Sequence, residues 1–211
     1  MRRCFIAGAG EYCGLFTPGA DDYIIAADGG YDALISHGIT PDVIIGDFDS
    51  IAETPALSNV ITAPAEKDDT DMLLAVKYGL SHGCDVFIID GALGGRFDHS
   101  FANLQVLNYI AGQSARGYLI GRDMCVTVLR DGEIRFAAEA SGYISVFSAG
   151  DRAEDVTISG LKYTVDNAAL TNDFPIGVSN EFIGEFVSIT VRNGAIAVMW
   201  QCGIEFLAEI K

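Results

Sequence analysis

The residues best suited to chemistry in this sequence are aspartates that follow apolar segments. Asp47 and Asp49 stand one residue apart, directly after Gly46 and the apolar run 43–45. The run predicts a buried strand, and the glycine predicts a turn after it. Two carboxylates this close repel each other, so at neutral pH they favour a shared cation or a hydrogen-bond donor on each. Considered alone, the segment fits a metal site and an Asp-rich turn that caps a helix equally well.

Two further acidic groups follow other apolar segments of the first half. Asp28 follows the run 23–27, and Asp68, Asp69 and Asp71 open a predicted helix. If the strands are parallel, all three groups lie at the carboxyl edge of one sheet, where ligands bind in open α/β folds. Turns and helix caps explain any one group, and for Asp68 or Asp69 they are the better explanation. They explain three converging groups poorly, because clustered carboxylates destabilise a fold unless cations neutralise them.

Oxygen ligands of this kind are suited to Mg²⁺, which commonly binds one or two carboxylates together with substrate phosphates. We therefore expect a magnesium site at this edge of the sheet. Lys67 lies beside the third acidic group. Pairing with the aspartates or a phosphate oxygen and simple solvation are equally good interpretations of this lysine.

A glycine-rich turn, 91–95, connects an apolar strand to a predicted helix. A helix N-terminus is a natural anion site, and Arg96 could hold a phosphate through two parallel hydrogen bonds. Arg96, His99 and Asn103 have the spacing of one helix face. A lone histidine such as His99 is more often structural than catalytic, and Asp98 is well explained as a first-turn charge favoured by the helix dipole.

The remaining polar segments give weaker signals. Gly8-Ala9-Gly10 resembles part of a phosphate loop, but Cys13 stands where G-x-G-x-x-G requires glycine. The sequence contains no Walker A pattern, which excludes a P-loop NTPase. Ser179-Asn180-Glu181 interrupts a strand-like stretch and fits a plain loop better than a ligand contact. Trp200 is the only tryptophan, and most single tryptophans belong to a core, although one at the edge of a site can stack on an aromatic ligand.

The first 120 residues alternate between strand-like and helix-like segments, and these elements must position the side chains described above. A stripe of Phe97, Phe101, Leu104 and Leu107, opposite the polar face of Arg96, predicts the buried side of the last helix. Several strands are apolar on both faces, which argues for a mostly parallel sheet with helices on both faces. Strands are expected at 4–7, 23–27, 43–45, 59–62, 86–89 and 118–120, and helices at 31–37, at 70–82 and from residue 96.

The pattern changes after Gly121. Asp131-Gly132 separates the runs 126–129 and 134–136, and Asn193-Gly194 separates 187–191 and 196–199. Each arrangement predicts a β-hairpin. We therefore expect an α/β domain over residues 1–122, followed by an antiparallel β-sandwich or barrel over residues 123–211.

Composition limits the possible partners. The chain has 211 residues and a formal net charge of −16, which argues against nucleic acid or an anionic membrane as a partner. This negative charge is still compatible with a small phosphate ligand when divalent metal is present. The five cysteines have no CxxC spacing, so we expect small buried apolar residues in a reducing compartment. No apolar run reaches the ~20 residues of a membrane span, and the N-terminal run is too short for a signal peptide. These features predict a cytoplasmic protein.

Taken together, the motifs closely resemble those of the thiamine pyrophosphokinase family, and they occur in the same order over most of the chain. The matching segments are Ala27-Asp28-Gly29-Gly30, Pro41 to Ser50, Lys67-Asp68-Asp69-Thr70-Asp71, Gly94 to His99 with Asn103, and Ser179-Asn180-Glu181. No single segment is specific, but the ordered set is. The resemblance implies transfer of the pyrophosphoryl group of ATP to the thiamine hydroxyl, giving thiamine diphosphate and AMP. It also implies an ATP-binding α/β domain, a C-terminal β-sandwich, and a homodimer with sites at the subunit interface.

The resemblance also implies roles for individual residues. The acidic cluster for Mg²⁺ and the phosphates would consist of Asp28, Asp47, Asp49 and Asp71, with either Asp71 or Asp49 as proton acceptor. The nucleotide side would consist of Lys67, Thr70, Arg96, Asp98 and Asn103. The thiamine side would consist of Ser179, Asn180 and Trp200, the last of which lies outside the matching motifs.

Two other functions remain as alternatives. Asp47-Phe48-Asp49 also fits the site of a Mg²⁺-dependent phosphatase with a carboxylate nucleophile. Such an enzyme would leave the downstream motifs unexplained. A sensor of thiamine or nucleotide without turnover is the second alternative, although a sensor would have no need of all four carboxylates.

Overall fold

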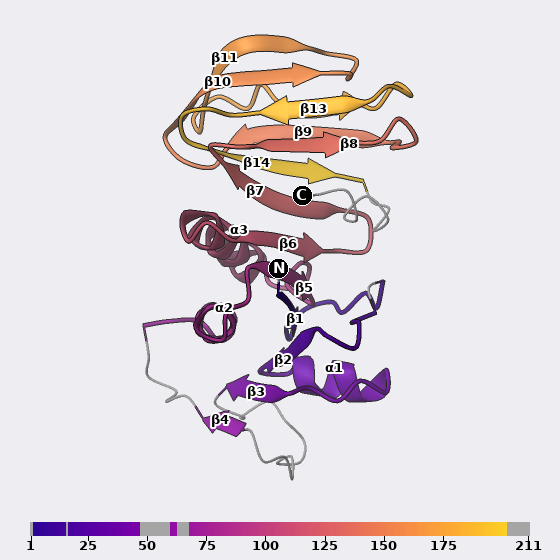
Figure 1. The fold of residues 1–211 in the computed structure, drawn as a ribbon, viewed down its shortest axis with the longest axis vertical. Coiled ribbons are helices and arrows are strands. Elements are labelled where there is room, and N and C mark those ends of the chain that lie inside the picture. The colour runs from indigo at the N-terminus through magenta and orange to yellow at the C-terminus, as the bar shows by residue number, and fades with distance from the viewer. Residues whose placement is uncertain (1, 16, 47–59, 63–67, 202–211) are drawn as a thin grey trace. The chain divides into compact units, whose positions relative to one another are not determined.

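The computed structural model describes residues 2–15, 17–46, 60–62 and 68–201 (Figure 1). The chain forms two compact units, Met1–Gly121 and Arg122–Lys211. None of the described helices is long and apolar enough to cross a membrane.

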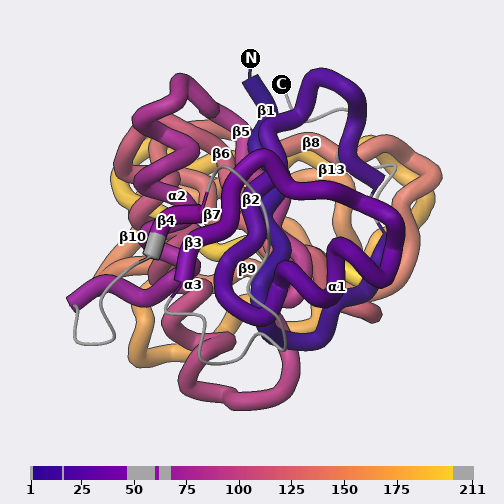
Figure 2. The backbone as a smooth tube through the Cα atoms, turned by 90° about the horizontal axis from the view of Figure 1, so that it is seen from below, coloured from indigo at the N-terminus to yellow at the C-terminus, as the bar shows by residue number. Residues whose placement is uncertain are grey.

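Unit 1 contains a parallel sheet with the strand order β6-β5-β1-β2-β3-β4. The strands are β1 (Arg3–Ala7), β2 (Tyr23–Ala27), β3 (Val43–Gly46), β4 (Val60–Thr62), β5 (Val86–Asp90) and β6 (Arg116–Ile120). The helices are α1 (Gly30–Ser36), α2 (Asp71–Ser81) and α3 (Phe97–Gly112). Helix α1 covers one face of the sheet, and α2 and α3 cover the other (Figures 1 and 2). The predicted α/β fold of this half is confirmed.

The central strands are buried because their residues are apolar on both faces. In β1, Cys4 to Ala7 are at most 1% exposed. Residues 43–45 of β3 are at most 2% exposed. Helix α2 begins where the Oγ1 atom of Thr70 accepts a hydrogen bond from the backbone N–H of Leu73 at 3.2 Å. This N-cap fixes the start of the helix at Asp71.

The buried face of α3 differs from the predicted one. Phe97 is 82% exposed and Phe101 is 54% exposed. The buried positions are Asn103, Val106, Leu107 and Ile110, so Leu107 is the one member of the predicted stripe that is buried. This set includes a polar residue, Asn103, which the sequence analysis placed on the polar face with Arg96 and His99. The amide of Asn103 is satisfied inside the fold by a hydrogen bond to the carbonyl oxygen of Ala92, so burying it costs little.

Unit 2 consists of two antiparallel sheets, with strand orders β12-β9-β14-β7 and β11-β10-β13-β8. Strands of the two sheets contact each other, for example β9 with β11 and β10 with β14. The expected antiparallel β fold of the second half is therefore confirmed as a two-sheet arrangement. Its strands are β7 (Cys125–Arg130), β8 (Glu133–Phe136), β9 (Tyr143–Ser148), β10 (Arg152–Ser159), β11 (Val165–Thr171), β12 (Asn180–Glu181), β13 (Val187–Thr190) and β14 (Ala195–Trp200).

Both predicted hairpins of unit 2 are wrong. The turn at 131–132 connects β7 of one sheet to β8 of the other, and the turn at 193–194 connects β13 to β14 in the same way. The two turns bind each other: the backbone N–H of Gly194 donates to Oδ1 of Asp131 at 2.9 Å, and the N–H of Asp131 donates to the carbonyl oxygen of Gly194 at 3.2 Å. Local turn residues fix a change of direction, whereas the buried faces decide which strand each run joins.

The cysteines differ in part from the expectation of five buried thiols. Cys4 and Cys84 are free and buried, but Cys13 is partly exposed. Cys125 is disulfide-bonded. Cysteines that meet only through the fold leave no spacing signal in the sequence.

Candidate functional site

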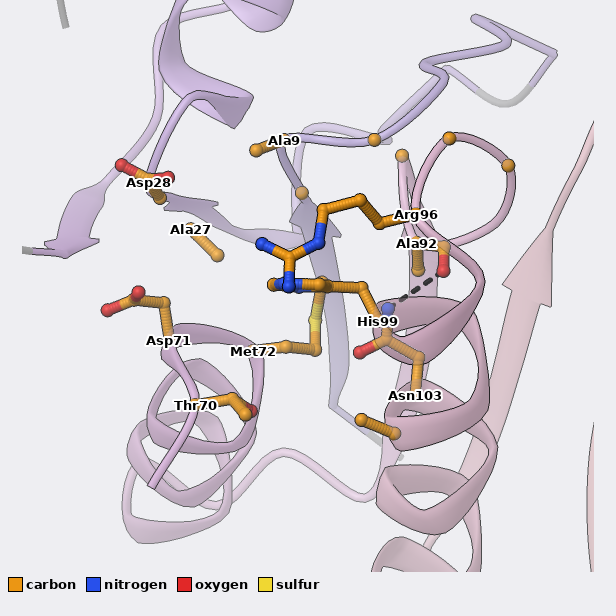
Figure 3. A pocket seen from close by; sticks show the side chains of 16 residues that line it. Ala9, Ala27, Asp28, Thr70, Asp71, Met72, Ala92, Arg96, His99 and Asn103 are labelled. Atoms are coloured by element: carbon orange, nitrogen blue, oxygen red, sulfur yellow. Dashed lines mark hydrogen bonds between the residues drawn. The ribbon is translucent and has the colours of Figure 1, made fainter. Parts of the chain in front are cut away.

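A cleft of about 380 Å³ lies at the carboxyl ends of the unit 1 strands (Figure 3). This volume is within the range of small-molecule sites. The cleft is lined by loops that follow β1, β2 and β5 and by the first turns of α2 and α3. The lining residues are Gly8, Ala9, Gly10, Ala27, Asp28, Thr70, Asp71, Met72, Gly91, Ala92, Gly94, Gly95, Arg96, His99, Ala102 and Asn103.

Asp28 and Asp71 supply the described carboxylates of this cleft, and Figure 3 shows them on one side, across from Arg96. Asp28 follows β2 with a φ of +50°, in the left-handed region. Its backbone N–H donates to the carbonyl oxygen of Ile45 at 2.9 Å. A Cβ atom placed on Gly46 would lie 3.1 Å from the Cα of Asp28. Adjacent strand ends therefore hold Asp28 in a strained conformation of the type that clusters at functional sites.

The predicted metal cluster is only partly within the described residues. Asp47, Asp49 and Lys67 lie outside them. Among the residues that the structure describes, no three His, Cys, Asp or Glu side chains are grouped to hold a metal ion. Asp28 and Asp71 are a pair of hard oxygen ligands at one cleft, which fits Mg²⁺ held by one or two carboxylates and substrate phosphates.

Arg96 stands immediately before α3 and reaches into the cleft (Figure 3). Its guanidinium donates two hydrogen bonds to the carboxylate of Asp98, at 3.2 Å from Nε and 2.6 Å from Nη2. These bonds lower the pKa of Asp98 and raise the pKa of Arg96. Both side chains are more than 60% exposed, so solvent screens the pair. A ligand phosphate can therefore compete with Asp98 for the guanidinium.

Two other predicted nucleotide residues, Asn103 and Thr70, also line the cleft. Asn103 is 8% exposed, and its Nδ2 atom donates to the carbonyl oxygen of Ala92 at 2.7 Å. This bond fixes the glycine-rich turn to α3, at the wall of the cleft. Thr70 lines the cleft and caps α2 with its hydroxyl. His99 also lines the cleft, from the first turns of α3.

Some cleft residues were given no role by the sequence analysis. Met72 is an apolar residue outside every motif, so nothing in the sequence pointed to it. Gly8-Ala9-Gly10 was only a weak signal, yet it forms one wall. Asp90 lies beneath that wall and is fully buried. An ionisable residue at the end of the apolar run 86–89 was the available signal for it.

The predicted thiamine residues lie in unit 2. Ser179 is exposed with a φ of +57°. Asn180 is 9% exposed. Its Oδ1 atom accepts hydrogen bonds from the backbone N–H groups of Tyr163 and Glu181, both at 2.9 Å. Its Nδ2 atom donates to the backbone carbonyl oxygen of Tyr163 at 2.6 Å. Trp200 is 1% exposed and packs edge-to-face on Phe136 at 5.3 Å. Contacts of these residues with thiamine stay predictions.

Comparison with known proteins identifies the family. The family model for "Thiamin pyrophosphokinase, catalytic domain" matches residues 19–119, and the model for "Thiamin pyrophosphokinase, vitamin B1 binding domain" matches residues 132–196. The chain belongs to the thiamine pyrophosphokinase family. The two matches cover well over half of the chain, one in each unit.

Individual members of the family support this assignment. The chain is 32% identical to the thiamine pyrophosphokinase of Bacillus subtilis over 182 residues, which cover 83% of this chain and 85% of the relative. The crystal structure of a Bacillus subtilis thiamine pyrophosphokinase matches with a TM-score of 0.84 at 27% identity, over 96% of this chain and 100% of that chain. The Candida albicans structure shares the fold, with a TM-score of 0.75 at 17% identity.

Family membership makes this chain an enzyme with thiamine pyrophosphokinase activity. The family uses ATP as its co-substrate. The interpretations as a phosphatase or as a sensor without turnover are therefore not retained.

Proposed function

We propose that the chain transfers the pyrophosphoryl group of ATP to the thiamine hydroxyl with the help of Mg²⁺ at the unit 1 cleft. The observation that carries this proposal is the pair Asp28 and Asp71 on one side of a cleft whose other side carries Arg96. Bound Mg²⁺ supplies neutralisation of the triphosphate charge. Transfer of this kind requires positioning and charge stabilisation more than covalent help from the protein.

The direct test is an assay of the purified protein with ATP, thiamine and Mg²⁺. We expect thiamine diphosphate and AMP in equal amounts, without release of free phosphate. We expect turnover to stop when EDTA removes divalent metal and to return when Mg²⁺ is added in excess. Absence of product with every divalent metal tested would refute the proposal.

We assign the metal to Asp28 and Asp71, together with Asp47 and Asp49, which lie outside the described residues. Either Asp71 or Asp49 accepts the proton of the thiamine hydroxyl. Asn at the accepting position would keep the side chain's size but lose its basic oxygen. A pH profile of kcat/KM would therefore lose its acidic limb only in the variant of the accepting residue.

We assign the nucleotide side to Lys67, Thr70, Arg96, Asp98 and Asn103. Arg96 would hold a phosphate group, Asp98 would release the guanidinium when ATP arrives, and Asn103 would hold the turn above it. The exposed Arg96–Asp98 pair supports this assignment, because a charged phosphate is the stronger partner for arginine.

We predict that Arg96→Ala raises the KM for ATP about 10- to 100-fold, since it removes hydrogen bonds to a charged group. Steady-state kinetics with varied ATP measures the effect. Arg135→Ala is a matched control, because Arg135 makes a similar two-bond pair with Glu133, two residues away on β8. Equal KM values for ATP in both variants would contradict the role of Arg96.

We assign thiamine to unit 2, at Ser179 and Asn180, with Trp200 as a further contact. The match of the vitamin B1 binding domain to residues 132–196 supports this assignment for the first two residues. Because Trp200 is the only tryptophan, its fluorescence reports on this unit without background. Unchanged emission at saturating thiamine would argue against a contact with Trp200.

We also propose a homodimer with sites at the subunit interface. Unit 2 exposes large apolar side chains, among them Phe174 at 64%, Ile176 at 65% and Phe186 at 56%. Exposed apolar surface of this kind commonly marks an interface. Light scattering should give twice the chain mass of 22.5 kDa, and a monomeric mass at micromolar concentration would exclude the dimer.

A further inference from the structure

Asp90 is a buried charged residue that the proposed chemistry does not use. It ends β5, after four apolar residues, and is 0% exposed. Burial of a carboxylate is costly unless hydrogen bonds compensate for the lost water. Desolvation raises the pKa of Asp90, whereas hydrogen bonds from Cys13, Gly91 and Gly14 lower it.

The carboxylate of Asp90 binds backbone groups of two loops. Oδ1 accepts from the N–H of Cys13 at 2.8 Å and of Gly91 at 2.7 Å, and Oδ2 accepts from the N–H of Gly14 at 3.0 Å. Gly91 belongs to the turn after β5. Cys13 and Gly14 belong to the loop after β1, 76 or more residues earlier in the chain. One side chain thus joins the two loops, through hydrogen bonds strengthened by its negative charge.

The same two loops form one wall of the cleft. The N–H of Gly8 donates to the carbonyl oxygen of Asp90 at 2.8 Å, and the N–H of Gly10 donates to that of Gly91 at 2.7 Å. The backbones are in direct contact, because a Cβ atom on Gly91 would lie 2.4 Å from the oxygen of Gly8. Gly8, Gly10 and Gly91 all line the cleft, whereas Asp90 does not.

Backbone bonds hold the loop after β1 as far as Glu11, whose N–H donates to the carbonyl oxygen of Leu93 at 3.3 Å. The Asp90 side chain therefore bears on the end at Cys13 and Gly14. Gly10 and Glu11 are exposed, so little packing holds this part of the loop. A loop held at one end only would have many conformations. Fixing it in one of them on binding would cost conformational entropy and reduce the affinity for a ligand. The bonds to Cys13 and Gly14 fix the far end of the loop as well.

We propose that Asp90 is a positioning residue for the nucleotide: its buried carboxylate holds the 8–14 loop against the 91–95 turn, so that the wall formed by both has the shape that ATP requires. Asp90 acts through backbone N–H groups and does not touch the substrate. The inference rests on the proposal that ATP binds in this cleft.

Asp90→Asn tests the inference, because asparagine has the same shape but no charge and presents an N–H₂ group where one acceptor was. We expect the KM for ATP to rise at least about tenfold, with kcat and the KM for thiamine changed less than about twofold. Asp42→Asn is the matched control. The side chain of Asp42 also accepts a hydrogen bond from a backbone N–H, that of Ile24 at 2.7 Å. Asp42 lies at the amino end of β3, whereas the cleft lies at the carboxyl ends of the strands.

The outcomes are distinct. An unchanged KM for ATP in Asp90→Asn, or the same change in Asp42→Asn, would overturn the inference, as would a loss confined to kcat. Inactive wild-type protein would instead refute the proposed function. If Asp90→Asn does not fold, hydrogen exchange of the wild-type protein decides. ATP should slow exchange of the 8–14 amides together with those of 91–95, and protection of 91–95 alone would overturn the inference.

Discussion

Asp71→Asn is expected to reduce kcat by roughly 10²- to 10⁴-fold while the protein remains folded. Asp71 is the first residue of α2 and lines the cleft beside Asp28. Asparagine keeps the size of the side chain but removes the negative charge that would hold Mg²⁺. Metal ions stabilise transition-state charge by several kcal/mol, and each 1.36 kcal/mol corresponds to a factor of ten in rate.

The measurement is kcat at saturating ATP and thiamine over a range of Mg²⁺ concentrations, with the melting temperature as a check on folding. Asp32→Asn is the matched control, since Asp32 is the first-turn acid of α1 and is absent from the cleft. Both variants lose the same favourable interaction with a helix dipole, typically 0.3–1 kcal/mol. Near-normal kcat in Asp71→Asn would exclude Asp71 from the metal site.

Gly30→Ala is expected to destabilise the protein by about 3 kcal/mol or more. Gly30 begins α1 and is buried. A Cβ atom at this position would lie 2.0 Å from the carbonyl oxygen of Ala7 and 2.5 Å from its carbon. These are backbone atoms of the central strand β1, so no side chain can rotate away to make room. The helix must move off the sheet, or the sheet must deform.

Thermal unfolding measures this effect, with an expected fall in melting temperature of roughly 10 °C. Gly112→Ala provides the contrast, because Gly112 ends α3 and its added Cβ atom would meet nothing within 4 Å beyond the neighbouring backbone of its own helix. The gain in helix propensity should leave that variant as stable as the wild type or up to about 1 kcal/mol more stable. Similar melting temperatures in the two variants would show that α1 can move away from β1 at Gly30 without a loss of stability.

The sequence allowed most of unit 1 to be predicted, because short apolar runs and glycine stops are local signals. Strand β2 was expected and found at residues 23–27, and the expected strand 43–45 became β3 (Val43–Gly46). The error in α3 arose where two apolar stripes overlap. The sequence favoured the stripe with Phe97, but the fold buries the one with Asn103, since Ala92 offers that amide a partner.

Two features of the molecule were beyond local patterns. The contact of Asp90 with Cys13 and Gly14 joins residues far apart in the chain, and no spacing rule predicts such a pairing. In unit 2, the residues of both turns were recognised, yet the strands on either side of each turn join different sheets. That choice depends on the packing of two faces and not on the turn itself.

The place of β14 in its sheet determines when unit 2 can be completed during synthesis of the chain. Strand β14 pairs with both β7 and β9, so it is the inner strand between them. A nascent chain that stops before Ala195 has made β7 and β9 but lacks the strand that joins them. The first-made strand of this sheet must therefore wait for nearly the last described residues before its edge is covered.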